Sequence, residues 1–124
     1  MKTIDICGVP FTVQIVDPSQ LEAPDDGGCI DEHSRQILLN SKLAEMQSPV
    51  LWDTLGHEWV HGVLGRTGFA DLLDNPKVEE GICTAIGVAL MQLLKGKGLD
   101  GSALLTQEAD DLDRRPGEES PSLP

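Results

Sequence analysis

The chain has 124 residues, with 9 Lys and Arg against 21 Asp and Glu, which gives a formal net charge of -12. This length favours one domain with a single modest core, and that core must be mainly aliphatic because the chain has two Phe, two Trp and no Tyr. The acidic excess argues against nucleic acid and against a membrane surface as partners, since both are bound through clustered Lys and Arg.

We expect a soluble, cytoplasmic protein. Asp5 and Pro10 interrupt the apolar residues near the N-terminus, which is not the pattern of a signal peptide. No stretch approaches the roughly 18 apolar residues that a membrane-spanning helix needs. Cys7, Cys29 and Cys83 are odd in number and form no Cys-x-x-Cys pair, so we interpret them as reduced thiols that behave as small apolar residues.

The first forty residues have the alternation of apolar and polar residues that is typical of β-strands. Two alternating runs, 3–7 and 11–16, flank a turn at 8–10, and an acidic loop follows at 17–28. Two further runs, 29–31 and 35–40, flank a turn at 32–34. The pattern predicts a small, mostly antiparallel sheet of three to four strands.

Two main helices are predicted after the sheet, and each begins with a capping residue followed by proline. Ser48-Pro49 opens the first helix and Asn75-Pro76 opens the second. Glycines at 65 and 68 end the first helix, and glycines at 96 and 98 end the second. Apolar residues at helical spacing predict one buried stripe on each helix. The stripes are Leu51, Trp52, Leu55, Trp59, Val63 and Leu64, and then Val78, Ile82, Ile86, Ala89, Leu90, Leu93 and Leu94.

The composition changes at residue 100. Residues 100–124 contain seven acids, two Arg and three Pro. We interpret residues 1–99 as the folded domain and residues 100–124 as a flexible acidic tail, with at most a short helix at its start. The fold class that follows is α+β.

The segment His57-Glu58-Trp59-Val60-His61 places the pattern His-Glu-x-x-His inside the first predicted helix. His57 and His61 are four residues apart and project from one face of the helix, where two imidazoles can bind one Zn²⁺. Glu58 is rotated from His57 by about 100°, which puts its carboxylate beside the metal as a general base. We therefore predict a zinc site with His57 and His61 as ligands and Glu58 as the catalytic residue.

A catalytic zinc site usually has a third protein ligand and one open position. Glu79 and Glu80 lie near the start of the second predicted helix, which an antiparallel pairing brings beside His61. Adjacent helical residues diverge by about 100°, so the two acids cannot both point at the metal. Acids also favour the first turn of a helix because of its dipole, and the Cys83 thiol is a further chemical alternative.

Three segments stand out, and they are Gly28-Cys29-Ile30-Asp31, Arg35-Gln36-Ile37-Leu38-Leu39 and Thr54-Leu55-Gly56-His57-Glu58-Trp59-Val60-His61. Together they resemble the small phage and mobile-element zincins related to the ImmA/IrrE-type metallopeptidases. The resemblance covers roughly residues 3–95, and the acidic tail departs from it. In that family a later helix carries the ligand Glu, then a small residue, and an Ala five positions after the Glu. Glu80, Gly81 and Ala85 match this pattern, so the resemblance favours Glu80 over Glu79 as the third ligand.

The resemblance implies a minimal zincin-like fold and a zinc-dependent metallopeptidase that acts on a protein or peptide substrate. Glu58 would take a proton from a zinc-activated water and return it to the leaving amine. By the same analogy the strand at 35–40 would be the cleft edge that pairs with an extended peptide.

Two points bear against this expectation. Stabilisation of the oxyanion needs a further donor, and without a Tyr the candidates are His33 and Arg66, each of which also fits an ordinary turn or surface position. The alternative is a non-catalytic, zinc-stabilised binding or regulatory protein of phage origin. Glu58 favours the enzyme, because a structural zinc site has no use for an acid beside the metal.

Overall fold

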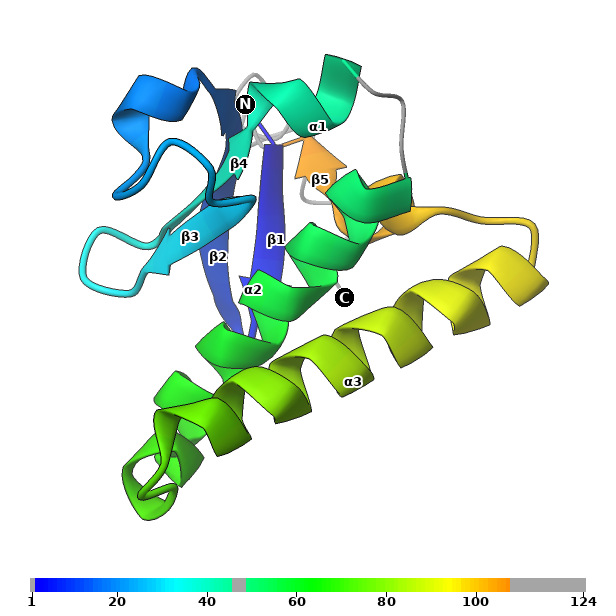
Figure 1. Ribbon diagram of the computed structural model, residues 1–124. Helices are drawn as coiled ribbons and strands as arrows, with labels where there is room; N and C mark the ends of the chain where they lie inside the picture. Colours follow the sequence, from blue (N-terminus) through cyan, green and yellow to red (C-terminus); the bar gives the residue numbers. More distant parts are fainter. Residues whose placement is uncertain (1, 46–48, 108–124) are drawn as a thin grey trace, which may run out of the picture.

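A mixed β-sheet packs against one of two long helices in the computed structural model of the chain, which describes residues 2–45 and 49–107 (Figure 1). The strands are β1 (Lys2–Ile6), β2 (Val9–Val16), β3 (Gly28–Asp31), β4 (Gln36–Asn40) and β5 (Thr106–Gln107). The α-helices are α1 (Ser41–Glu45), α2 (Pro49–Thr67) and α3 (Pro76–Gly96). Short 3-10 helices lie at η1 (Pro18–Gln20), η2 (Phe69–Leu72) and η3 (Gly101–Leu104). The predicted α+β class with two main helices is confirmed.

The strands lie in the order β3-β4-β2-β1-β5, and only the β2–β4 pair is parallel among the described strands. The four longer strands are those that the sequence predicts, and the two-residue β5 adds a fifth. The β1–β2 hairpin turns at Cys7 and Gly8, whose φ angles are +52° and +87°. The turn is therefore tighter than the predicted span 8–10, and Val9 and Pro10 already belong to β2. β3 is an edge strand, whereas β4 lies inside the sheet.

One core joins the sheet to α2. Its buried members are Ile4, Ile6, Phe11, Ile37 and Leu39 from the strands and Leu51 and Leu55 from α2. Burial of a side chain of this size stabilises the fold by about 1.5–3 kcal/mol. The core residues of β1 and β4 lie two positions apart, Ile4 and Ile6 in β1 and Ile37 and Leu39 in β4, which agrees with the period-2 pattern of the sequence.

α2 lies between the sheet and α3 (Figure 1). On the sheet side, a Cβ added at Gly62 would lie 2.7 Å from Ile6. On the other side, a Cβ added at Gly87 would lie 2.8 Å from the backbone nitrogen of His57 and 3.0 Å from the carbonyl carbon of Gly56. The two helices therefore meet backbone to backbone where Gly56 faces Gly87.

This close crossing overturns the predicted stripe of α3. The buried residues of α3 are Cys83, Gly87 and Met91, one every four positions. Val78, Ile86 and Leu93 were expected to be buried, but they are 47%, 48% and 59% exposed. Small side chains are required where the backbones touch, so the face that packs is not the most apolar face of the helix.

The predicted ends of the helices agree with the structure. The Asn75 side chain accepts a hydrogen bond from the Lys77 N–H, with Pro76 at the first helical position. Gly68 follows α2 with a left-handed φ of +82°. The expected cap Ser48 lies outside the described residues.

The folded unit extends beyond residue 99, where the sequence analysis ended the domain. Gly101 packs so closely on Trp52 that an added Cβ would lie 2.6 Å from the indole. β5 then pairs with Lys2 and Thr3 of β1. The remaining residues of the predicted tail, 108–124, lie outside the described part. Within residues 2–45 and 49–107, no helix has the length and apolarity to cross a membrane.

Candidate metal centre

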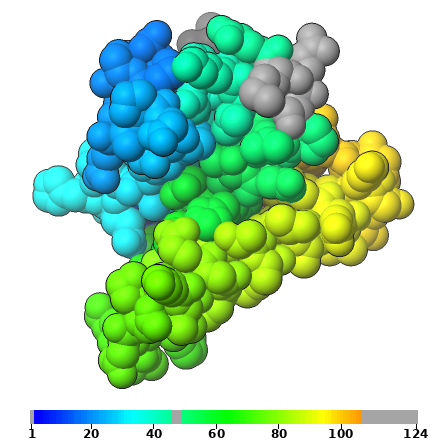
Figure 2. Space-filling model, in the orientation of Figure 1, coloured from blue at the N-terminus to red at the C-terminus, as the bar shows by residue number. Residues whose placement is uncertain are grey.

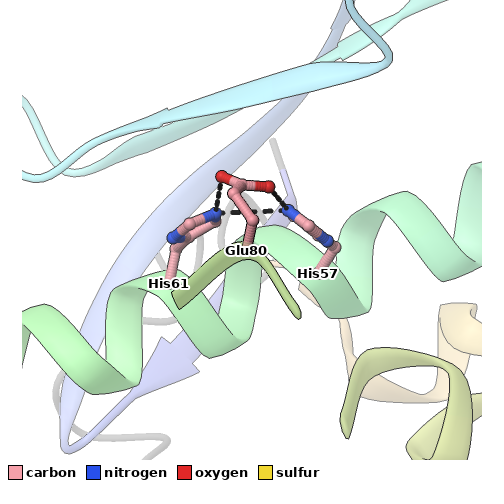
Figure 3. Close-up of side chains that lie close together, drawn as sticks. All are labelled: His57, His61 and Glu80. Atoms are coloured by element: carbon pink, nitrogen blue, oxygen red, sulfur yellow. Dashed lines mark hydrogen bonds and ion pairs between the residues drawn. The ribbon is translucent and has the colours of Figure 1, made fainter. Parts of the chain in front are cut away.

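α2 and α3 bring three potential ligands together (Figure 3). The Nε2 atom of His57 lies 2.9 Å from one carboxylate oxygen of Glu80, and the Nε2 atom of His61 lies 2.8 Å from the other. The two Nε2 atoms are 3.2 Å apart. These three residues form one of two groups of potential ligands found among the described residues.

The local sequence explains this convergence. His57 and His61 are one turn apart on α2, so their rings share a face. The glycine crossing lets α3 approach α2 closely enough for Glu80 to reach both rings, although 19 residues separate it from His61 in the chain. Glu80 itself is 60% exposed and His61 only 16%, so the site opens to solvent on the Glu80 side.

The three side chains could hold a divalent metal such as Zn²⁺. Tetrahedral ligands at the usual Zn–N and Zn–O distances lie about 3.3 Å from one another. The two Nε2 atoms are 3.2 Å apart, and each lies 2.8–2.9 Å from a different oxygen of Glu80. The Nδ1 atom of His61 lies 2.6 Å from a carboxylate oxygen of Glu79 and must donate its proton to it. In a neutral ring the Nε2 lone pair then faces the Glu80 carboxylate. A proton on Nε2 or a cation at the centre of the group removes this conflict between acceptors.

The second nitrogen of each ring has a partner of its own. Glu79 holds Nδ1 of His61, and the hydroxyl of Thr84 lies 3.2 Å from Nδ1 of His57. Such partners fix the tautomer and the orientation of a ligating imidazole and typically strengthen metal binding. Glu79 and Glu80 therefore contact different atoms. Glu80 is a candidate ligand, whereas Glu79 binds the Nδ1 atom of His61. Thr84 was missed by the sequence analysis, although it lies one turn after Glu80 on the same face.

Glu58 lines the same cleft and is only 8% exposed. Burial raises the pKa of its carboxyl group to about 7, with a further contribution from the charges of Glu80 and Asp26, while His61 acts in the opposite direction. A carboxyl group with a pKa near neutrality is well suited to exchange protons with a substrate.

The Cys83 thiol belongs to a second group of side chains, with His61 and Glu79. Cys83 is fully buried. Burial is the main cause that raises the pKa of its thiol to about 12, and the charges of Glu79 and Glu80 contribute to the rise. The group with Cys83 contains only one of the two motif histidines, whereas the group with Glu80 contains both. The group that contains Glu80 is therefore the better candidate site.

The three candidate ligands and Glu58 stand on the wall of a cleft of about 680 Å³. In Figure 2 the green atoms of α2 are seen between the cyan β3 region and the yellow-green atoms of α3. The rest of the wall comes mainly from β3 and the loop before it, and it includes Glu22, Asp26, Gly28, Cys29 and Ile30.

Two expectations about this cleft are corrected. The predicted edge strand at 35–40 cannot pair with a peptide, because β4 already has neighbours on both sides, and β3 is the edge beside the cleft. His33 and Arg66 do not line the cleft wall. His33 lies in the exposed β3–β4 turn, and Arg66 is exposed near the end of α2.

Comparison of the chain with known protein families, with curated proteins and with solved structures finds no match. The function therefore has to be argued from the cleft and its residues.

Proposed function

We propose that the chain is a zinc-dependent metallopeptidase of the cytoplasm, related to the small zincins that its sequence resembles. His57, His61 and Glu80 hold the metal, and Glu58 is the general base. The observation that carries the proposal is the buried Glu58 carboxylate, which shares one cleft with the three convergent ligand atoms. A site that only stabilised the fold would not need a buried acid at this position, where burial costs free energy.

A bound Zn²⁺ supplies Lewis acidity at this position. Glu58 takes the proton from the attacking water and gives it to the leaving nitrogen, a relay that a buried carboxyl group beside the metal can perform in both directions. Glu79 and Thr84 hold the two imidazoles so that both Nε2 atoms keep their lone pairs for the metal.

The peptide lies along β3 in this proposal. The outer edge of β3 is not paired with another described strand, so its backbone N–H and C=O groups can form hydrogen bonds with an extended substrate. β3 and the two histidines line the same cleft. A substrate paired with this edge therefore runs past the metal centre.

One observation favours the alternative, a zinc-stabilised binding or regulatory protein without peptidase activity. The described cleft wall contains no Lys, Arg or Tyr, so the oxyanion lacks the usual charged or phenolic donor beside the metal. Thr54 and Thr84 provide hydroxyl groups on the wall, and a hydroxyl is a weaker donor than a charged group.

Elemental analysis of the purified protein, combined with two variants, tests the proposal. The wild type should contain one equivalent of zinc and cleave a denatured protein such as casein. Glu58→Gln should keep the zinc and lose at least 100-fold in cleavage rate, since general base catalysis contributes about 10²–10⁴-fold. His61→Ala should lose the zinc.

The outcomes separate the two candidate functions. A wild type that contains zinc but does not cleave, with unchanged zinc in Glu58→Gln, supports the binding protein. A wild type without zinc, purified in the absence of chelators and unable to take up added zinc, contradicts both.

A further inference from the structure

The wall of the metal cleft is strongly acidic. Five carboxylates line it, from Glu22, Asp26, Asp53, Glu58 and Glu80, and no Lys or Arg lines it. Glu58 and Glu80 belong to the proposed metal centre, where a divalent metal would offset their charge. The other three carboxylates, from Glu22, Asp26 and Asp53, have no place in the proposed chemistry.

These three carboxylates do not form a second metal site. Neither of the two groups of potential ligands found in the described chain contains any of them, so their oxygen atoms do not converge on one point. They stand on different elements: Glu22 and Asp26 in the loop before β3, and Asp53 in the second turn of α2. Charges spread along a cleft in this way match an elongated cationic ligand better than a single ion.

The three side chains are also free to bind. No salt bridge from Lys or Arg to any of them is found among the described residues, and no hydrogen bond to their carboxylate oxygens. Asp26 engages Asn40 through its backbone carbonyl, at 2.9 Å, so the loop is anchored while its carboxylate stays available. The negative charges also act on β3. Burial is the main cause that raises the pKa of the Cys29 thiol, and the charges of Glu58, Glu22 and Asp26 raise it further.

We propose that the cleft selects cationic segments: an extended peptide lies along the edge of β3, with Lys or Arg side chains near its reactive bond paired to Glu22, Asp26 and Asp53. The inference rests on the proposed function for the reaction, but the charge preference is a property of binding and can be measured without cleavage. Because these pairs lie in an open cleft, each contributes modestly, and selectivity comes from the three together.

The first test measures binding with the zinc-loaded Glu58→Gln variant, which cannot consume its ligand. The probes are three fluorescein-labelled peptides of equal length that alternate Ala with Lys, Gln or Glu, and the readout is fluorescence anisotropy. We expect the Lys peptide to bind about 10-fold more tightly than the Gln peptide, given three pairs of modest strength each. The Glu peptide should bind most weakly, and 0.5 M salt should reduce the differences.

Asp26 and Asp25 provide a matched pair of variants. They are neighbours in one loop, and Asp26 lines the cleft whereas Asp25 is exposed and does not. In the same background, Asp26→Asn should weaken binding of the Lys peptide about 2- to 5-fold and leave the Gln peptide unchanged. Asp25→Asn changes the net charge equally and should have no effect. Glu22→Gln, on an exposed side chain, serves as a second cleft variant if Asp26→Asn disturbs the loop.

Equal losses in Asp25→Asn and Asp26→Asn would overturn the inference, because the charge of the whole molecule would then explain the preference. Equal binding of the Lys and Gln peptides would also overturn the inference. A second readout uses the zinc-loaded wild type on a mixed peptide library, with cleavage sites found by mass spectrometry. Cleavage without enrichment of Lys or Arg near the cut contradicts the inference and leaves the peptidase standing. Charge-selective binding without any cleavage contradicts the peptidase alone.

Discussion

At the scale of single residues, two adjacent glutamates have different roles because successive positions on a helix point in different directions. Glu80 reaches the Nε2 atoms of both rings, and Glu79 reaches the Nδ1 atom of His61 from the other side. The sequence narrowed the candidates for the third ligand to these two glutamates and the Cys83 thiol, and the resemblance favoured Glu80. The use of Glu79 could not be foreseen, because it depends on which nitrogen of His61 each of the two glutamates reaches.

Substitutions of the two glutamates should therefore differ in their effect on zinc affinity. Glu80→Gln replaces a carboxylate ligand by an amide and should abolish tight binding. Glu79→Ala should lower the affinity by about 10- to 100-fold, which is the usual cost of losing the partner of a ligating histidine. Glu79→Gln keeps an acceptor for the Nδ1 proton and should restore part of the loss. Competition with a chromogenic chelator measures all three, and a Glu79→Ala protein that binds zinc like the wild type would contradict the role of Glu79.

Glu58 should make the metal-free protein sensitive to pH. The pKa of its carboxyl group is about 7 in the folded state against a usual 4.5, so the folded state binds the proton more tightly. This contribution to stability is fully present below pH 4.5 and is lost as the pH rises through 7. Between pH 5 and pH 8, the free energy of unfolding of the wild type should fall by roughly 2–3 kcal/mol relative to Glu58→Gln. Urea unfolding in EDTA measures this difference, and a difference that stays constant with pH would contradict the burial of a charged Glu58.

At the scale of elements, local signals predicted the strands and the helix ends, and contacts distant in sequence decided the rest. Asn75 and Pro76 start α3 through hydrogen bonds within a few residues, which a sequence displays directly. The parallel pairing of β2 with β4 joins segments about 24 residues apart and has no local signature. It places β4 inside the sheet and β3 at the edge, which is why the wrong strand was assigned to the cleft. The α2–α3 crossing likewise depends on Gly56 and Gly87 meeting, and Ile86 and Leu93 therefore face outward.

The glycine crossing makes a specific prediction about α3. Gly87→Ala places a methyl group 2.8 Å from the His57 backbone nitrogen, so α3 has to move away from α2. Forced overpacking of this kind costs about 1–3 kcal/mol, and because Glu80 moves with α3, zinc affinity should fall as well. Gly96→Ala is the control, since an added Cβ there meets nothing within 4 Å and helix propensity favours Ala by up to about 1 kcal/mol. Thermal unfolding and zinc titration of both variants test this, and equal behaviour would mean that the crossing is not tight.

At the scale of the whole molecule, the candidate metal centre connects α3 to α2, and these two helices are held in the fold in different ways. α2 shares the main core with the sheet, whereas α3 packs mainly on α2 through Cys83, Gly87 and Met91. Both histidines belong to α2 and Glu80 belongs to α3. A metal bound by all three therefore fastens α3 to the rest of the fold. Catalytic competence and the docking of α3 should then depend on the same ion.

Removal of the metal should consequently lower the stability of the whole domain. A ligand that binds only the folded state at 100 times its dissociation constant stabilises it by about 2.7 kcal/mol. For a domain of this size, that corresponds to a rise in melting temperature of roughly 10 °C or more. Circular dichroism melts with EDTA and with added zinc measure the shift, and magnesium serves as the control ion because it requires octahedral oxygen ligands. The shift should disappear in Glu80→Gln, which retains both histidines but no longer carries a ligand on α3. A shift that persists in this variant would mean that zinc stabilises the protein without connecting the two helices.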